Sequence, residues 1–386
     1  MNGQDKQNVF DKSAKQEAKQ LAAIQAQTRD EIAALLKQAY ADAVEILKNQ
    51  PTDYQQWYYP QVKNNIGQAL ADLGAATGAA ATAGQQTAWE AGRDLVDKPF
   101  AAAGVAVKAM LPAINTSQLL AMQAFMTGKM QDVSAEALAK INTQLGLTMI
   151  GGQGVEDAIK GIQDAHTMSR KRATIIVRTE LGRAYATASQ LRMEQSAERL
   201  PNLKKQWRRS GKIHSRRSHD FTDGQIRPVK KPFIIGTGAV IEGQEGSGPR
   251  LMYPHDPKAP ASETVNCGCM SIPYMDEWKD AGILQDPGRR AFTAQEIALN
   301  PAKADYAATM DNFVPLAEQL GNKPLPIKRA KTVADAERFA DSLGITSVVY
   351  TDNLAIGNRV NGILDTVYRQ NLPMPDHVKI SQKPFD

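Results

Sequence analysis

Apolar positions recur at helical spacing through the start of the chain. Between residues 11 and 48, leucine, isoleucine and tyrosine return at intervals of three, four and eight residues, and alanine, glutamine, lysine and glutamate fill most other positions. This spacing draws one apolar stripe along an amphipathic helix. Pro51 follows a polar turn, so we expect this helix to end just before it.

Residues 66–108 are rich in alanine, glycine and threonine, which permit close helix packing but specify little else. We expect Pro99 and Pro112 to break this stretch into two or three helices. Ser134 is a candidate N-cap for a helix over 134–145. A glycine-rich turn at 151–154 is followed by the pattern of two further helices, over 156–165 and 169–199.

The pattern of apolar and polar residues changes after Pro201. Between residues 204 and 269, turn residues interrupt short apolar runs every few positions, as at Asp223-Gly224. This pattern predicts a small, hairpin-rich β subdomain that docks on the preceding helix. Residues 271–321 return to helix with turns.

The last part of the chain alternates between helix and strand patterns. We expect a helix over 332–343, a strand over 346–351, a helix over 354–370 and a strand that begins at 378. The chain stops soon after that strand begins. Either the chain is the leading part of a longer or proteolysed protein, or it ends in a small α/β interaction module.

The predicted fold class is therefore α+β. It comprises a long helical N-terminal region, a small hairpin-rich β subdomain packed on a helix, and a C-terminal α/β appendage. The predicted boundaries are 1–165 for the helical region, 166–275 for a domain that combines the basic helix with the β subdomain, 276–330 for a helical linker, and 331–386 for the C-terminal module, whose completeness stays open.

Charge is distributed unevenly. The 386 residues carry 46 Lys and Arg against 41 Asp and Glu, but residues 170–231 alone have a net charge of +12, while the flanking regions have −3 and −4. Such asymmetry points to a polyanionic partner. No run of 18 apolar residues indicates a membrane span, and the polar first ten residues contain no secretory signal. Two cysteines are too few for a disulfide scaffold and fit a reducing compartment.

Arginine predominates among the basic residues of this segment, and guanidinium groups match phosphate geometry with paired hydrogen bonds. We therefore expect contact with a polyanion, with a protein partner or internal ion pairing as the alternatives. The candidate residues lie on the predicted helix and on the strand and loop after it: Arg170, Lys171, Arg172, Lys204, Lys205, Arg208, Arg209, Lys212, Arg216 and Arg217.

A series of short motifs crosses the same region. It runs through Val177-Arg178-Thr179-Glu180-Leu181-Gly182-Arg183-Ala184-Tyr185, Lys205-Gln206-Trp207, Arg216-Arg217-Ser218-His219, Asp223-Gly224-Gln225, Tyr253-Pro254-His255-Asp256-Pro257 and Asn266-Cys267-Gly268-Cys269. In order and spacing this series resembles the phage Mu protein F-like family of minor head proteins, also called phage head morphogenesis proteins. The resemblance covers roughly residues 170–272, with Gly268 standing where the family usually has arginine.

The resemblance implies a minor structural protein of a tailed-phage head, located near the portal and acting in head assembly, DNA packaging or ejection. The implied partners are the portal or major capsid protein and, non-specifically, duplex DNA. The implied location is the virion head, assembled in the host cytoplasm. We expect no enzymatic activity, and leave open what a missing C-terminal domain would carry. The alternative is a head-delivered effector or toxin carrier whose active C-terminal domain is truncated or cleaved.

Structural roles are expected for the motif residues Arg178, Glu180, Arg183, Trp207, His219, Gly224, Pro254, Cys267 and Cys269. Glu180 and Arg183 are three residues apart and should pair on the helix surface. Gly224 is expected to adopt a positive φ within its turn. No catalytic residue is predicted, because the chain contains no HExxH, GxSxG or Walker motif.

The two cysteines allow three interpretations. With His219, Cys267 and Cys269 would offer three zinc ligands. A disulfide is disfavoured because residues two apart lie near the upper limit of bridging distance. We expect reduced structural cysteines and no cofactor, and zinc remains the alternative.

Overall fold

The computed structural model describes residues 3–48, 59–105, 111–149, 152–236, 248–275, 290–311, 347–349 and 377–379. It is mostly helical, with small antiparallel sheets in the middle region, so the predicted α+β class is confirmed. The chain divides into two compact units. The first contains Met1–Gln206, Pro228–Pro232 and Leu251–Gln285, and the second contains Trp207–Arg227, Phe233–Arg250 and Asp286–Asp386.

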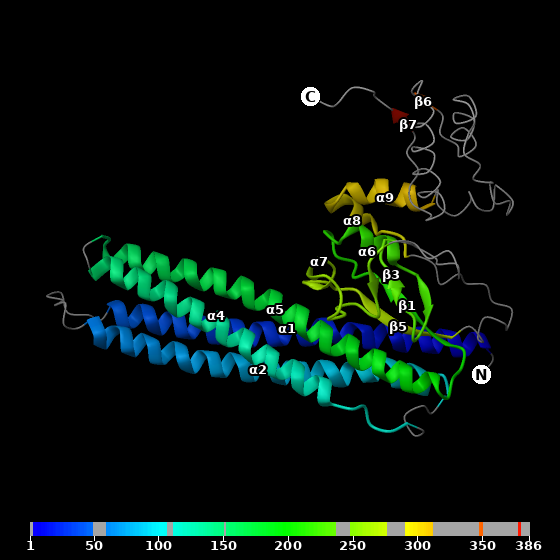
Figure 1. The fold of residues 1–386 in the computed structure, drawn as a ribbon, viewed down its shortest axis with the longest axis horizontal. Helices are drawn as coiled ribbons and strands as arrows, with labels where there is room; N and C mark the ends of the chain where they lie inside the picture. The colour runs from blue at the N-terminus through cyan, green and yellow to red at the C-terminus, as the bar shows by residue number, and fades with distance from the viewer. Residues whose placement is uncertain are drawn as a thin grey trace, which may run out of the picture. The chain divides into compact units, whose positions relative to one another are not determined.

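Four long helices dominate the first unit, and they lie side by side in Figure 1. They are α1 (Gly3–Lys48), α2 (Tyr59–Ala102), α4 (Ser117–Met149) and α5 (Val155–Ala197). Their shared core includes Leu36, Ile66, Trp89, Ile141 and Val177. The helical N-terminal region is therefore present, and its apolar stripes face one another because that removes them from water.

Helix boundaries differ from the sequence-based expectation in three places. Pro99 lies inside α2 rather than ending it, because it sits in the last turn and costs the helix one hydrogen bond there. Ser134 is not an N-cap: it is buried within α4, and its hydroxyl donates to the Met130 carbonyl at 3.3 Å. The two helices expected over 156–199 form one helix, α5, for which Gly154 is the N-cap.

The β strands are short. The sheet β2-β1-β5 is built from β1 (Leu203–Arg208), β2 (Ile226–Pro228) and β5 (Met270–Met275). A second sheet joins β3 (Phe233–Ile234) to β4 (Arg250–Leu251). Two short helices, α6 (Arg217–Thr222) and α7 (Ala261–Thr264), interrupt the strands. The hairpin-rich β region expected over 204–269 is confirmed. Residues 271–275 were expected to be helical with turns, but they belong to β5, because this strand pairs with β1 in the sheet.

The later part of the chain contains α8 (Ala294–Leu299), α9 (Ala302–Asp311) and a parallel pair of strands. In that pair, β6 (Ser347–Val349) runs beside β7 (His377–Lys379), with Val348 opposite Val378. Both strands overlap the predicted ones. The helices predicted over 332–343 and 354–370 lie outside the described residues. None of the helices in the described ranges is long and apolar enough to cross a membrane.

Candidate functional site

The motif stretch of α5 binds the segment that precedes α7. Glu180 and Arg183 form the predicted ion pair, with 2.7 Å between Oε2 and Nη1. Arg183 also donates through Nε to the backbone carbonyl of His255 at 3.4 Å. Gly182 lies directly under the imidazole of His255, where a Cβ on residue 182 would be 2.5 Å from Nε2. Glycine at 182 therefore allows the histidine loop to approach the helix axis.

Asp256 folds that loop. Its carboxylate accepts from the backbone N–H of Met252 at 2.8 Å and from that of Lys258 at 2.9 Å. His255 adopts a φ of 67°, in the left-handed region. Pro254 is buried beside it and presets one backbone dihedral. The Tyr-Pro-His-Asp-Pro motif thus forms a compact, internally bonded turn against α5.

The cysteine loop is tied to the same helix. The backbone N–H of Asn266 donates to the hydroxyl of Thr179 at 2.9 Å, and Asn266 has a φ of 54°. Cys267 and Cys269 follow, and both are buried thiols rather than halves of a disulfide. The N–H of Cys269 donates to Sγ of Cys267 at 3.4 Å.

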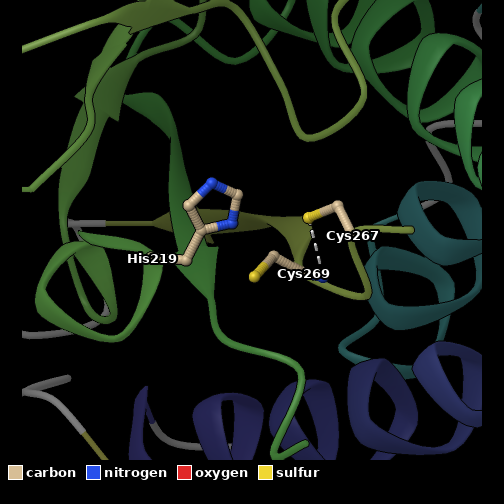
Figure 2. A group of neighbouring side chains, drawn as sticks. All are labelled: His219, Cys267 and Cys269. Atoms are coloured by element: carbon tan, nitrogen blue, oxygen red, sulfur yellow. Dashed lines mark hydrogen bonds between the residues drawn. The ribbon is translucent and has the colours of Figure 1, made fainter. Parts of the chain in front are cut away.

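His219, Cys267 and Cys269 form a group of potential metal ligands. Their ligand atoms all lie within 4.8 Å of one another, and all three residues are buried. Figure 2 shows the imidazole beside the two sulfur atoms. The three residues weighed as zinc ligands from the sequence are thus brought together in the fold.

Trp207 organises the second unit. It is fully buried, with its ring edge-on to His219 and Phe233 at centroid distances of 5.3 Å each. Gly224 has a φ of 83° and donates its N–H to the Trp207 carbonyl at 2.9 Å, as its predicted turn requires. Gln225 continues the pairing by accepting from the Trp207 N–H at 2.9 Å.

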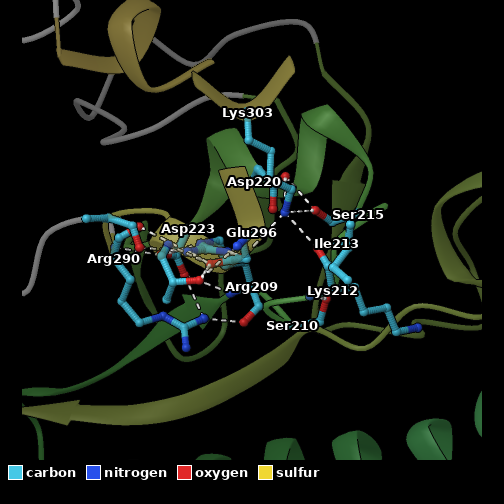
Figure 3. A network of polar contacts seen from close by, with 12 residues as sticks. Arg209, Ser210, Lys212, Ile213, Ser215, Asp220, Asp223, Arg290, Glu296 and Lys303 are labelled. Carbon is cyan, nitrogen blue, oxygen red and sulfur yellow. Dashed lines mark hydrogen bonds and ion pairs between the residues drawn. The ribbon is translucent and has the colours of Figure 1, made fainter. Parts of the chain in front are cut away.

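A buried polar network lies in the same unit, and Figure 3 shows its members. Arg209, 4% exposed, pairs with Glu296, and its backbone N–H donates to Oδ1 of Asp223 at 2.7 Å. Lys303, 0% exposed, donates to the Lys212 carbonyl at 2.7 Å and to the Ser215 hydroxyl at 3.0 Å. Both cations thus have acceptors inside the protein, which lowers the free-energy cost of burying their charge.

Ionisation in this network follows from its contacts. Burial works against the charged form of Glu296, but hydrogen bonds from Arg209, the Thr293 backbone and Lys303 hold its pKa at about 2. Burial raises the pKa of Asp220, and the contacts with Ser215 and Lys303 only partly offset that. Burial likewise raises the pKa of Glu180, against the opposing effect of Arg183.

The ten basic residues predicted to bind a polyanion divide by burial. Lys205 and Arg209 are interior: Lys205 is 0% exposed and donates to the Met252 carbonyl at 2.6 Å, so neither belongs to a basic surface. Their burial could not be predicted, because a sequence does not show which cations have acceptors inside the fold. The exposed ones are Arg170, Lys171, Arg172 and Arg217, and those of intermediate exposure are Lys204, Arg208, Lys212 and Arg216.

Two of the exposed arginines have defined neighbours. Arg172 forms an ion pair with Glu136 on α4. Arg217 stacks over Phe221 and Tyr306, with its guanidinium carbon 5.1 and 4.9 Å from the ring centroids. Both keep exposed surface that an anion can reach.

Sequence reasoning overlooked several residues of these networks. Glu296 and Lys303 were not singled out, although Thr293 and Glu296 form a capping box that the spacing could have revealed. Arg192 lies within the basic segment 170–231, yet it is 2% exposed and pairs with Asp97 on α2. No local signal in the sequence marks that pair, because its members are 95 positions apart.

Comparison with known proteins identifies this region. Residues 139–272 match the family model described as "Phage Mu protein F like protein". The match contains every motif quoted above and begins earlier than expected, within α4.

Two curated relatives are each 32% identical to the chain. One is the NAD(+)--arginine ADP-ribosyltransferase EFV of Enterococcus faecalis (strain ATCC 700802 / V583), over 125 residues. The other is the uncharacterized protein YqbB of Bacillus subtilis (strain 168), over 127 residues.

Each alignment covers 32% of the chain, but only 23% of the first relative and 38% of the second. No solved structure matches the chain. The family motifs and the loops that bond to α5 all lie within the matched region. Residues 139–272 therefore form a phage Mu protein F-like domain.

Proposed function

We propose that the protein is a minor structural protein of a tailed-phage head, located near the portal and acting in head assembly, DNA packaging or ejection. The observation that carries this proposal is the match of residues 139–272 to the phage Mu protein F-like family. The chemistry of the domain agrees with a structural role, since its motif residues bond to one another: Glu180 to Arg183, Arg183 to His255, and Asn266 to Thr179.

The helical part offers surfaces for portal or capsid protein. Leu120 and Phe125 on α4 are 63% and 48% exposed, which is typical of side chains that a partner can cover.

The partner proposed for the basic residues is duplex DNA. Arg170 and Lys171 are exposed on α5, and a sequence-independent binder needs only such phosphate contacts. Arg216 and Arg217 provide a second group at the start of α6. Arg209 is left out of this surface, since its replacement would break a buried network.

DNA retention tests this part of the proposal. We expect two sets of substitutions to weaken retention on duplex DNA at about 50 mM salt. The first set is Arg170→Ala with Lys171→Ala, and the second is Arg208→Ala with Arg216→Ala and Arg217→Ala. The slope of log affinity against log salt should fall by about 0.9 for each phosphate interaction that a substitution removes.

The control replaces Lys15 and Lys19, which are exposed on α1, by alanine, and it removes the same charge as the Arg170 and Lys171 pair. Retention that is unchanged in both sets of variants, or reduced equally in the control, contradicts a DNA surface at these positions.

The location is tested in assembled particles. We expect purified heads to contain the chain at low copy number, with density beside the portal in a particle reconstruction. Heads that assemble, package and eject normally when the gene is deleted would contradict the proposed role.

A second candidate is a head-delivered effector carrier, and a specific observation favours it. The relative from Enterococcus faecalis is named an arginine ADP-ribosyltransferase, and the aligned part is only 23% of that protein. Under this hypothesis the chain carries or once carried an active C-terminal domain. Purified chain is incubated with labelled NAD⁺ and an arginine-bearing acceptor, and is also expressed in host cells. Absence of both transfer and toxicity, with a gene that encodes nothing beyond residue 386, removes this candidate.

A further inference from the structure

We propose that Cys267, Cys269 and His219 bind a zinc ion. Two thiols and an imidazole form a donor set that zinc takes in proteins, whereas magnesium and calcium take oxygen ligands. The three side chains are 4%, 4% and 1% exposed, so the group lies out of contact with bulk water.

The spacing of the ligand atoms suits one small cation. They lie within 4.8 Å of one another. In a tetrahedral zinc site with Zn–S of about 2.3 Å and Zn–N of about 2.0 Å, ligand atoms are separated by about 3.5 to 3.8 Å. Side-chain rotations that move an atom by about 1 Å close that difference without a backbone shift.

The backbone prepares the sulfur atoms for a metal. The N–H of Cys269 points at Sγ of Cys267, 3.4 Å away, and such a bond favours the thiolate over the thiol. The loop is held in place by the Asn266 N–H, which donates to Thr179 of α5. Asn266 takes a left-handed φ of 54° immediately before Cys267, so the chain turns sharply where the cysteines begin.

The imidazole is oriented by its own neighbours. His219 lies on α6, and the edge-on contact with Trp207 fixes the plane of its ring. The imidazole is therefore held in one orientation, close to the two sulfur atoms. A cation bound by all three residues would make use of this placement.

Three protein ligands leave one tetrahedral position for water or another small donor. The ion would add metal–ligand bonds to a region whose strands are only two to six residues long. We therefore expect a structural effect, in which removal of zinc lowers the unfolding temperature.

Metal content tests the proposal directly. The full chain is produced without a polyhistidine tag in zinc-supplemented medium and analysed by mass spectrometry of the elements. We expect about one zinc per chain in the wild type, and less than about 0.2 in Cys267→Ser, Cys269→Ser and His219→Ala. The matched control is His214→Ala, which removes an exposed histidine just before α6 and should retain the metal.

A second measurement uses the wild type alone, so it does not depend on whether the variants fold. Cobalt(II) added to metal-free reduced protein should produce thiolate-to-metal charge-transfer absorption, and zinc should then displace it. Bound zinc should also slow reaction of the two thiols with a disulfide reagent until a chelator is added. Wild-type protein with less than about 0.2 zinc per chain, no cobalt absorption and chelator-independent thiol reactivity overturns the proposal.

Discussion

Arg192 and Asp97 form a buried ion pair that links two helices. Arg192 donates through Nε to Oδ1 of Asp97 at 2.6 Å and through Nη2 to Oδ2 at 3.0 Å, and the two side chains are only 3% and 4% exposed. Its Nη1 also donates to the Pro112 carbonyl at 3.0 Å. The Arg192 guanidinium, which contributes to the positive charge of residues 170–231, therefore links α5 to α2.

We expect Arg192→Met to destabilise the helical unit by about 3–5 kcal/mol, because Asp97 would remain buried without its partner. The double variant with Asp97→Asn should lose much less stability than the sum of the two single changes. Urea unfolding followed by helical circular dichroism measures both.

The control for this pair is Arg29→Met, which removes an exposed ion pair with Asp30 and should change stability by no more than about 1 kcal/mol. Equal losses of stability at Arg29 and Arg192 would contradict the assignment of Arg192 to a buried bridge.

Glu296 makes a pH-dependent contribution. Its pKa is about 2 in the folded protein, below the ordinary 4.5. The folded state therefore binds fewer protons than the unfolded state in that window, so its contribution is complete above pH 4.5 and is lost as the pH falls toward 2. We expect Glu296→Gln to flatten the fall of the unfolding temperature over this range.

Thermal unfolding of the two proteins between pH 4.5 and 2 provides the measurement. Glu31→Gln, at an exposed position on α1, should keep the wild-type slope. A slope in Glu296→Gln as steep as in the wild type would show that other groups cause the acid lability.

At the scale of elements, the four long helices depend on small residues at their crossings. A Cβ on Gly92 of α2 would clash with the backbone carbonyl of Tyr185 on α5, so the two backbones are in direct contact there. Gly67, on the same helix, has nothing within 4 Å of its Cβ position. The two glycines therefore have opposite physical roles.

We expect Gly92→Ala to cost roughly 1–3 kcal/mol, because the helices must separate to admit the methyl group. Gly67→Ala should instead gain about 0.5–1 kcal/mol, since alanine loses less backbone entropy in a helix. Chemical unfolding of both variants gives the signs. Two changes of the same sign would show that the helix crossing does not require Gly92.

For the whole molecule, the main surprise is how much residues 290–311 contribute. This stretch lies wholly within the predicted helical linker over 276–330, yet Glu296 and Lys303 are buried and complete the network around Arg209 and Asp220. This segment therefore belongs to the core of the second unit.

We expect a chain that ends at residue 311 to keep hydrogen-exchange protection over residues 207–227, and a chain that ends at 285 to lose it. In the shorter chain Arg209 and Asp220 would be buried without Glu296 and Lys303, which is costly. Protection of α2 is the internal control and should be the same in both. Equal protection of 207–227 in both chains would contradict the role given to 290–311.

Much of this protein followed from the sequence alone. Periodic apolar positions determined the long helices, dense turn residues determined the β region, and the spaced motifs indicated the phage Mu protein F-like domain, because these signals are local and recur at fixed intervals. The i,i+3 pair Glu180–Arg183 and the turn glycine Gly224 were predictable for the same reason.

Only the tertiary structure decided which charged and sulfur-bearing residues serve the interior. Lys205 and Arg209 resemble Arg170 and Lys171 in the sequence, but they find acceptors in segments distant along the chain. The meeting of His219 with Cys267 and Cys269, and of Arg192 with Asp97, likewise depends on long-range packing. A sequence shows which side chains can bond, but burial removes water as the competing partner and so selects the bonds that form.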